Sequence, residues 1–274
     1  MSTTGNAKRN TRHADGRSCD KVATYAAWLA AQGYDSETIN SKVRLLHRLP
    51  PLDEVTQDDV LDLISQPDKN SSKRIYLNTL RLAFHDMGVL GLVDHNPTEG
   101  LRTPPIQRGK PRPIPPHELA LLDTMRERER GWGVLGLRAG LRAIEVTRVQ
   151  GNHLEHGVHG WQLRVPNGKG DKDATIPAHP EVVELLQAQP KTSEPLWGFH
   201  SRYISRKWRE HAEKVGVHGR RFHDLRHTFA TAAYKASGQD LLLTRDLCRH
   251  TSVQSTQIYA GVDDERPFAV VAGL

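Results

Sequence analysis

The chain has 274 residues, 37% of them hydrophobic and 26% charged, which is the profile of a soluble globular protein with two domains. No apolar stretch approaches the roughly 20 residues that a membrane span needs, and the polar N-terminus lacks the apolar segment of a secretory signal. The two cysteines, Cys19 and Cys248, are too few for a disulfide framework or a four-thiolate zinc site. We therefore expect a cytoplasmic protein with no contact with a membrane.

The formal net charge is +6, and basic residues concentrate in four stretches, at residues 8–13, 108–112, 206–211 and 219–227. Such clusters favour a polyanionic partner such as DNA, because neutralising phosphates releases counterions. A basic surface that only contacts solvent would explain the same composition. Charge alone does not separate these two interpretations.

The first part of the chain predicts a small all-helical domain. Residues 1–16 are polar and basic and are expected to form a flexible arm. Residues 17–101 then contain four helical patterns, at about 20–33, 35–49, 56–65 and 71–90. Their expected boundary signals are Gly33 as a helix stop, Asp35 or Ser36 as an N-cap, and Thr56 with Asp59 as an approximate capping box.

A proline-rich segment separates this domain from the rest. Six prolines and four basic residues fall between positions 102 and 116, which excludes helix and central strand. We interpret residues 102–114 as an extended, basic linker and residues 115–274 as a second domain. The basic linker could lie across a phosphate backbone. A spacer with no role in binding would explain the same composition.

The second domain predicts a mainly α fold with a small antiparallel sheet. A helix is expected to open at 115–129, with proline early, and residues 132–150 are helical in pattern. Residues 160–179 read as two short strands joined by a turn rich in glycine and lysine. Further helices are expected at about 180–188, 201–215, 222–236 and 240–248.

Several residues in this domain suit phosphate chemistry. His223 and Arg226 are three positions apart, so on a helix they share a face and could hold a phosphate oxygen. Tyr259 could act as a nucleophile if cations favoured its phenolate, and Lys169 or Lys172 on the hairpin turn could protonate a leaving oxygen. Each has a plain alternative: a basic helix surface, a packed tyrosine and solvated loop lysines.

Taken in order, these residues resemble the active site of the tyrosine recombinase (phage integrase) family. The family pattern is Gly-Leu-Arg-x-x-Glu, Gly-Lys-Gly-x-Lys, His-x-x-Arg-His, and a histidine shortly before a tyrosine. The corresponding candidate catalytic residues are Arg142, Lys169, His223, Arg226, His250 and Tyr259, with Glu145 beside them. The resemblance spans about residues 18–265. It implies a four-helix, SAM-like core-binding domain before the catalytic domain, in a minimal Xer-like layout without an arm-binding domain.

The resemblance also implies a mechanism. Tyr259 would attack a DNA phosphodiester and form a 3′-phosphotyrosyl bond, and the released 5′-hydroxyl would attack a partner duplex through a Holliday junction. No metal, ATP or cofactor is expected. The implied roles are as follows: Arg142 and Arg226 bind the non-bridging phosphate oxygens, and Lys169 (with Lys172 as competitor) is the general acid. His223 assists proton transfer at the tyrosine, His250 donates a hydrogen bond to a phosphate oxygen, and Glu145 orients its neighbours.

Double-stranded DNA is the implied partner, in a homotetramer formed by exchange of the apolar tail after Tyr259; an excisionase or host factor is a further candidate. A role of the tail in solubility or turnover is the alternative. Other DNA contacts are expected at Arg108, Lys110, Arg112, Lys172, Arg220 and Arg221. Integration of phage or mobile-element DNA is the preferred biology. The alternatives are resolution of replicon dimers, a catalytically silent DNA-binding regulator with this fold, and a metal-dependent nuclease.

Three further local features of the second domain give expectations: a repeated sequence, an unusual arginine and a group of histidines. In the doublet Gly-Leu-Arg-Ala at 136–143, Gly140 is expected to end one helix with Arg138 in its last turn, and Arg142 to fall in the first turn of the next. Arg249 stands where the family usually has glycine. The histidines at 153, 156 and 159 lie in a turn-rich segment before a strand, and we expect no metal there.

Overall fold

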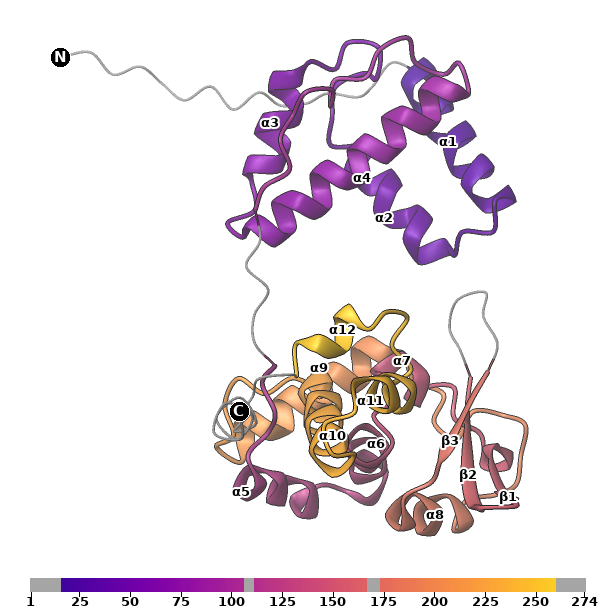
Figure 1. Ribbon diagram of the computed structural model, residues 1–274. Helices are drawn as coiled ribbons and strands as arrows, with labels where there is room; N and C mark the ends of the chain where they lie inside the picture. Colours follow the sequence, from indigo (N-terminus) through magenta and orange to yellow (C-terminus); the bar gives the residue numbers. More distant parts are fainter. Residues whose placement is uncertain (1–15, 106–110, 167–172, 260–274) are drawn as a thin grey trace, which may run out of the picture. The chain divides into compact units, whose positions relative to one another are not determined.

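A computed structural model of the chain describes residues 16–105, 111–166 and 173–259. The chain divides into two compact units, Met1–Arg108 and Gly109–Leu274 (Figure 1). Within the described ranges, no helix is both long enough and apolar enough to cross a membrane.

The first unit consists of helices α1 (Gly16–Ala31), α2 (Ser36–Leu46), α3 (Gln57–Ser65) and α4 (Asn70–Val89). The predicted boundary signals are confirmed. Asp35 caps α2 by accepting the Thr38 N–H at 2.8 Å, and Thr56 and Asp59 form a capping box at the start of α3. Gly33 follows α1 with φ +82°, a left-handed conformation that glycine adopts without strain.

The core of this unit lies on one face of α4. Leu80, Ala83 and Met87 are buried there, as the helical spacing predicts. Tyr25 of α1 packs into the same core, and its hydroxyl donates to Asp86 at 3.0 Å.

The second unit is mainly helical with one small sheet, which confirms the predicted fold class. The strands β1 (Leu154–Gly157), β2 (Gly160–Val165) and β3 (Ala174–Pro177) are antiparallel in the order β1-β2-β3. The helical elements are α5 (Pro116–Leu119), the 3₁₀ turn η1 (Ala120–Thr124), α6 (Glu127–Arg138), α7 (Ala143–Val146), the 3₁₀ turn η2 (Gly151–His153), α8 (Pro180–Gln187), α9 (Ser201–Lys214), α10 (Phe222–Ala236), α11 (Leu241–Cys248) and α12 (Gln254–Gln257).

The predicted break at Gly140 is confirmed, since the chain turns there between α6 and α7. The structure corrects two other details of the predicted elements. Residues 115–129 are broken into α5, η1 and the start of α6. The segment that was interpreted as turns before a strand contains β1, whose short pairing with β2 leaves little alternation to recognise.

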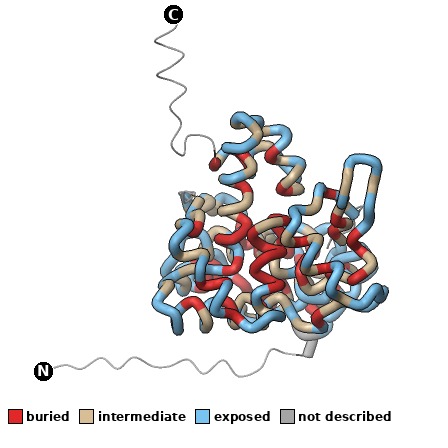
Figure 2. Tube along the Cα trace, turned by 90° about the horizontal axis from the view of Figure 1, so that it is seen from below, coloured by how far each residue is buried: buried red, intermediate tan, exposed pale blue. Residues whose placement is uncertain are grey.

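Helix α6 is the centre of the second unit. Its residues from Gly131 to Leu137 are all buried, and Figure 2 shows that buried positions gather in the interior. A Cβ at Gly136 would lie 3.1 Å from a side-chain carbon of Leu225, so glycine allows α6 and α10 to approach closely. Ile114 joins this core, and its N–H donates to Thr228 Oγ1 at 2.8 Å.

Shortening a core leucine of α4 should destabilise the first unit far more than shortening an exposed one. Leu80 is fully buried, whereas Leu82 on the same helix is 55% exposed. Leu80→Ala should lower the free energy of unfolding by about 2–5 kcal/mol through lost burial and a residual cavity, and Leu82→Ala by less than about 0.5 kcal/mol. Urea unfolding followed by circular dichroism measures both. Equal losses would contradict this packing.

Candidate active site

The candidate site is organised around the buried guanidinium of Arg226 on α10. Arg226 is 1% exposed. Its Nη1 donates to the carbonyl of Gly140 at 2.5 Å, and its Nη2 donates to the carbonyl of Cys248. The Glu145 carboxylate lies 3.8 Å from Nη1. One side chain therefore connects the turn between α6 and α7 to the end of α11.

Glu145 is the acid that balances this charge. Its carboxylate accepts from the Arg142 backbone N–H at 2.7 Å, from Arg142 Nη1 at 2.6 Å and from Arg249 Nη2 at 3.1 Å. Burial alone would raise the pKa of Glu145, but Arg249, the backbone hydrogen bond of Arg142, and the charges of Arg226 and Arg142 together lower it. Glu145 is therefore ionised at neutral pH.

The two arginines of the repeated Gly-Leu-Arg-Ala sequence have different environments. Arg142 is the N-cap residue of α7, one position before the first turn in which the sequence analysis placed it. Its side chain is 37% exposed while bonded to Glu145, so it is held and still accessible to a ligand. Arg138 ends α6, as predicted, and pairs with Glu181 of α8 at 2.8 Å, where both side chains are well exposed.

Gly140 makes the turn between these arginines possible. Its φ is +61°, and a Cβ there would lie 2.4 Å from a ring carbon of Phe229. Both the backbone conformation and the contact with α10 therefore require glycine. The turn places the Gly140 carbonyl against Arg226, which confirms that Gly140 separates two helices.

Arg249 is a part of this cluster whose contacts the sequence did not reveal. It follows α11 in the left-handed conformation, with φ +53°, at the position where the resemblance leads one to expect glycine. Its guanidinium donates to the carbonyls of Ala139 at 3.2 Å and Gly140 at 3.0 Å, besides Glu145. The only available signal was the departure from glycine itself. The structure shows an arginine that holds the same turn as Arg226.

His223 and His250 lie close enough to the arginines of the site for the arginine charges to act on them. Desolvation, together with the neighbouring His227 and the charges of Arg226 and Arg142, lowers the pKa of His223. Desolvation and the three nearby arginines lower the pKa of His250 to about 4. Nδ1 of His250 lies 2.9 Å from Thr256 Oγ1, and its ring is parallel to that of Tyr259, with centroids 6.3 Å apart. Both histidines are neutral at pH 7 and can act as hydrogen-bond donors.

Tyr259 lies at the end of the described chain, directly after α12, and is 2% exposed. Burial raises the pKa of its phenol to about 12, with Cys248 acting in the same direction and Arg226 and Arg142 opposing it. The hydroxyl lies 2.7 Å from Nδ1 of His227. The family resemblance implies proton transfer at the tyrosine for His223. In the structure the residue in hydrogen-bond contact with the hydroxyl is His227, one helical turn further along α10.

A groove of about 650 Å³ borders the site. Helix α9 buries Ile204 and Trp208 on one face and turns a row of polar residues toward the groove. The groove is lined by Arg142, Ala143, Ile144, Ser201, Arg202, Ser205, Arg206, Arg209, Phe222 and His223. The arginines of α9 were not among the predicted contacts, although the basic stretch at 206–211 and the spacing of 202, 206 and 209 are visible in the sequence.

The remaining predicted contacts divide into two groups. Lys169, Lys172, Arg108, Lys110 and the tail after Tyr259 lie outside the described residues. Arg112 and Arg221 are exposed. Arg220 forms a bidentate ion pair with Glu118 of α5, in which Nε and Nη2 donate to the carboxylate oxygens at 2.5 Å and 2.9 Å. The guanidinium of Arg220 thus has an internal partner in this structure.

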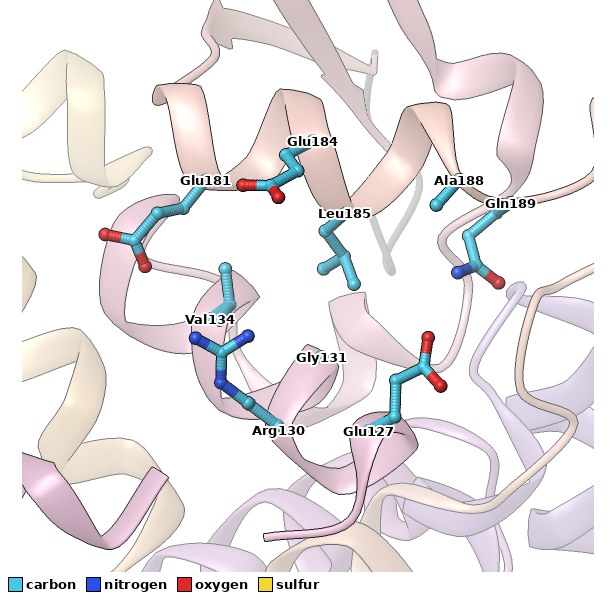
Figure 3. Close-up of a pocket in the computed structure, with 9 residues that line it drawn as sticks. All are labelled: Glu127, Arg130, Gly131, Val134, Glu181, Glu184, Leu185, Ala188 and Gln189. Atoms are coloured by element: carbon cyan, nitrogen blue, oxygen red, sulfur yellow. The ribbon is translucent and has the colours of Figure 1, made fainter. Parts of the chain in front are cut away.

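A second hollow, of about 180 Å³, lies between α6 and α8. Figure 3 shows acidic side chains of both helices around Val134 and Leu185. It is lined by Glu127, Arg130, Gly131, Val134, Glu181, Glu184, Leu185, Ala188 and Gln189, and none of these is a candidate site residue.

Two of the three histidines in the segment before β2 have other contacts within the protein. His153 is 3% exposed, and its Nδ1 accepts the Gln150 N–H at 3.3 Å, while His156 packs edge-on against Trp161. Within the described part of the chain, no group of three or more histidine, cysteine or acidic residues is arranged to hold a metal ion.

Comparison with known proteins gives consistent matches. Residues 117–266 match the model of the phage integrase family. A tyrosine recombinase of Pseudothermotoga lettingae is 28% identical over 211 residues, covering 72% of this chain and 73% of the relative. Tyrosine recombinase XerC of Serratia marcescens is 27% identical, with coverage of 71% and 70%. A lambda integrase tetramer bound to a Holliday junction shares the fold, with a TM-score of 0.68, 17% identity, and coverage of 94% and 85%.

Removing the charge of Glu145 should destabilise the second unit. Glu145→Gln leaves two buried guanidinium groups, Arg226 and Arg249, without their counter-charge and should cost about 3–5 kcal/mol. The control Glu181→Gln removes only the exposed pair with Arg138 and should cost less than about 1 kcal/mol. Chemical denaturation measures both changes.

The same substitution should alter the pH dependence of stability. Because the pKa of Glu145 is lower in the folded state, its contribution is present above the ordinary carboxyl range and is lost as the pH falls through the folded-state pKa. Glu145→Gln should therefore flatten the acid side of the stability curve relative to Glu181→Gln. Parallel curves for the two variants would contradict the role of Glu145 as the counter-ion.

Proposed function

Because the chain belongs to the phage integrase family, whose members are DNA strand transferases, we propose that it is a site-specific recombinase acting through a 3′-phosphotyrosyl intermediate. The observation that carries the proposal is the convergence around Tyr259. His250 stacks on its ring, and Arg142 and Arg226 are close enough to act on its pKa. Arg226 lies within α10, whereas the other three residues stand just before α7, just after α11 and just after α12, so only the fold brings them together.

The charge of the site suits a phosphodiester in its transition state. Among the described residues, the guanidinium groups of Arg142, Arg226 and Arg249 surround one carboxylate, Glu145. The net positive charge is fixed in place before substrate arrives, which is the arrangement that stabilises developing phosphoryl charge. Arg142 and Arg226 bind the non-bridging oxygens in this proposal. Arg249 stays engaged with Glu145 and the Gly140 turn.

The proposed reaction exchanges one phosphodiester for another. The Tyr259 oxygen forms a bond to phosphorus as the bond from phosphorus to the 5′-oxygen breaks. Lys169, or its competitor Lys172, protonates that 5′-oxygen, an assignment that rests on the family resemblance alone. His250 donates to a phosphate oxygen from the ring edge opposite its contact with Thr256. Since the bond energy is retained in the phosphotyrosyl ester, this reaction needs no ATP. In this proposal the fixed charges of Arg142 and Arg226 stabilise the phosphoryl oxygens in place of a metal ion.

Double-stranded DNA is the proposed substrate. The groove beside Arg142 and His223 exposes the arginines of α9, which suit contacts with phosphate on either side of the cleaved bond. We propose that each unit contacts DNA at the crossover site and that the active form is a homotetramer, as in the lambda integrase complex with a Holliday junction. In the same proposal, the tail after Tyr259 is exchanged between protomers, and an excisionase or host factor takes part. The protein acts in the cytoplasm.

Integration and excision of phage or mobile-element DNA is the biology we propose first. Resolution of replicon dimers is the second candidate, favoured by the similarity to XerC of Serratia marcescens. The DNA beside the gene discriminates between them, because an integrase gene often lies next to its own attachment site.

Tyr259→Phe should abolish covalent chemistry while leaving DNA binding intact. The full chain would be incubated, with EDTA and without ATP, with a pool of singly nicked duplexes of randomised sequence, and denatured adducts would be isolated and sequenced. We expect a 3′-linked adduct with the wild type and none with Tyr259→Phe, at equal retention of DNA. Adduct formation by the variant would refute the assignment of Tyr259. If the wild type binds without forming an adduct, the assay is repeated with Mg²⁺ in place of EDTA. No cleavage would then identify a silent regulator, and cleavage without an adduct would identify a metal-dependent nuclease.

The two arginines of the repeated sequence should differ in effect. On the recovered DNA site, Arg142→Ala should slow adduct formation by a factor of about 100 or more, because a donor to the transition state is lost. Arg138→Ala removes only the exposed pair with Glu181 and should leave the rate within about twofold of the wild type. Single-turnover rates measure both, and similar losses would contradict the distinction.

A further inference from the structure

We propose that His227 is a catalytic residue that accepts the proton of Tyr259 when the tyrosine attacks DNA and returns it when the strand is rejoined. This inference rests on the proposed function. It assigns a chemical role to the second histidine of the His-x-x-Arg-His sequence, for which the sequence analysis gave no role.

The hydrogen bond to the nucleophile carries the proposal. Nδ1 of His227 lies 2.7 Å from the Tyr259 hydroxyl, a distance suited to direct proton transfer. Tyr259 as a whole is 2% exposed, so few water molecules can contact it in the free protein. His227 is therefore the nearest acceptor for the phenol proton that the hydrogen bonds show.

His223 has a different position. It lines the groove together with Arg142, and its ring packs edge-on against His227, with centroids 4.8 Å apart at an angle of 82°. The two histidines on successive turns of α10 thus face different partners. His223 faces the space that the phosphate would enter, and His227 faces the tyrosine.

The surroundings of His227 keep it in the form that can accept a proton. Desolvation lowers its pKa, Asp224 opposes this, and Arg221 and Arg226 act in the same direction as desolvation. The other titratable groups against it are His223 on α10 and Tyr259 after α12. The ring is therefore neutral at pH 7, and an Nε2–H tautomer leaves the Nδ1 lone pair directed at the phenol.

The step balances without another reagent. As the tyrosine oxygen bonds to phosphorus, its proton moves to Nδ1 of His227, and the 5′-oxygen leaves with a proton from the general acid of the proposed function. On rejoining, the 5′-hydroxyl returns its proton to that general acid as its oxygen bonds to phosphorus. The bond from phosphorus to the tyrosine oxygen breaks, and His227 returns its proton to that oxygen.

A substrate with sulfur in place of the bridging 5′-oxygen separates the two proton transfers. The substrate is the DNA site recovered with the wild-type chain, and the sulfur leaves as a thiolate that needs no general acid. His227→Asn retains an acceptor near the Nδ1 position but cannot carry the proton. We expect it to form adduct about 100-fold or more slower on both substrates, whereas Lys169→Ala should be slow on the oxygen substrate and recover on the sulfur substrate. His218→Ala, an exposed histidine paired with Glu213, is the control with an unchanged rate.

The pH profile separates proton transfer from positioning. With His227→Asn, the rate should rise about tenfold per pH unit toward the pKa of the phenol, because hydroxide then removes the proton. In the wild type it should level off once His227 is neutral. An unchanged rate in His227→Asn, or its recovery on the sulfur substrate, would overturn the proposal while leaving the recombinase assignment intact. A wild type that forms no adduct would overturn both.

The resting wild type supplies an independent measurement should the variant fail to fold. Nitrogen NMR of histidine-labelled full-length protein distinguishes a bare Nδ1 from a protonated one. We expect a neutral His227 with the proton on Nε2 and a signal that changes in Tyr259→Phe. A proton on Nδ1 at pH 7 would overturn the proposal.

Discussion

The arrangement of the site depends on burying one guanidinium, that of Arg226. An isolated buried charge is unfavourable, so it needs hydrogen-bond acceptors and a counter-charge at fixed positions. The acceptors are the carbonyls of Gly140 and Cys248, and the counter-charge is Glu145. Each belongs to a different segment, and each can reach Arg226 only if the chain turns at Gly140 and α11 ends at Cys248. The charge requirement of one residue thereby fixes the geometry of the others.

The same constraint explains why the site remains electropositive. Desolvation and the charges of Arg142 and Arg249 lower the pKa of Arg226 to about 10, which still leaves it charged at neutral pH. Glu145 is shared among three arginines and cannot neutralise all of them. The excess charge costs stability in the free protein and is compensated when an anion binds. Such a trade between stability and binding is typical of functional sites.

Much of the fold follows from local sequence. The caps at Asp35 and Thr56 depend on neighbouring residues, and their predictions are confirmed. The helical pattern at 71–90 is confirmed as α4. The ordered motifs likewise identified the family. Strand β1 was missed because its four residues pair without a clear alternation of buried and exposed positions.

The contacts within the site could not be read from the chain in the same way. That Arg249 reaches Gly140 and that His227, rather than His223, reaches Tyr259 depends on how α10, α11 and α12 pack. Sequence spacing places His223 and His227 on neighbouring turns of one helix face, so it cannot distinguish which of them meets the tyrosine. Tertiary packing makes that choice.

Along helix α10, residues that pack into the core alternate with residues that belong to the candidate site. Phe222 and Leu225 pack into the hydrophobic core, while His223 and His227 lie on the side of the reacting groups. Each added residue rotates the following part of a helix by about 100°. A single insertion or deletion between His223 and His227 would therefore rotate one of them by about 100° relative to the other, so that both could not keep their places beside the reacting groups. In the evolution of this segment, side chains can change one at a time, but its length cannot.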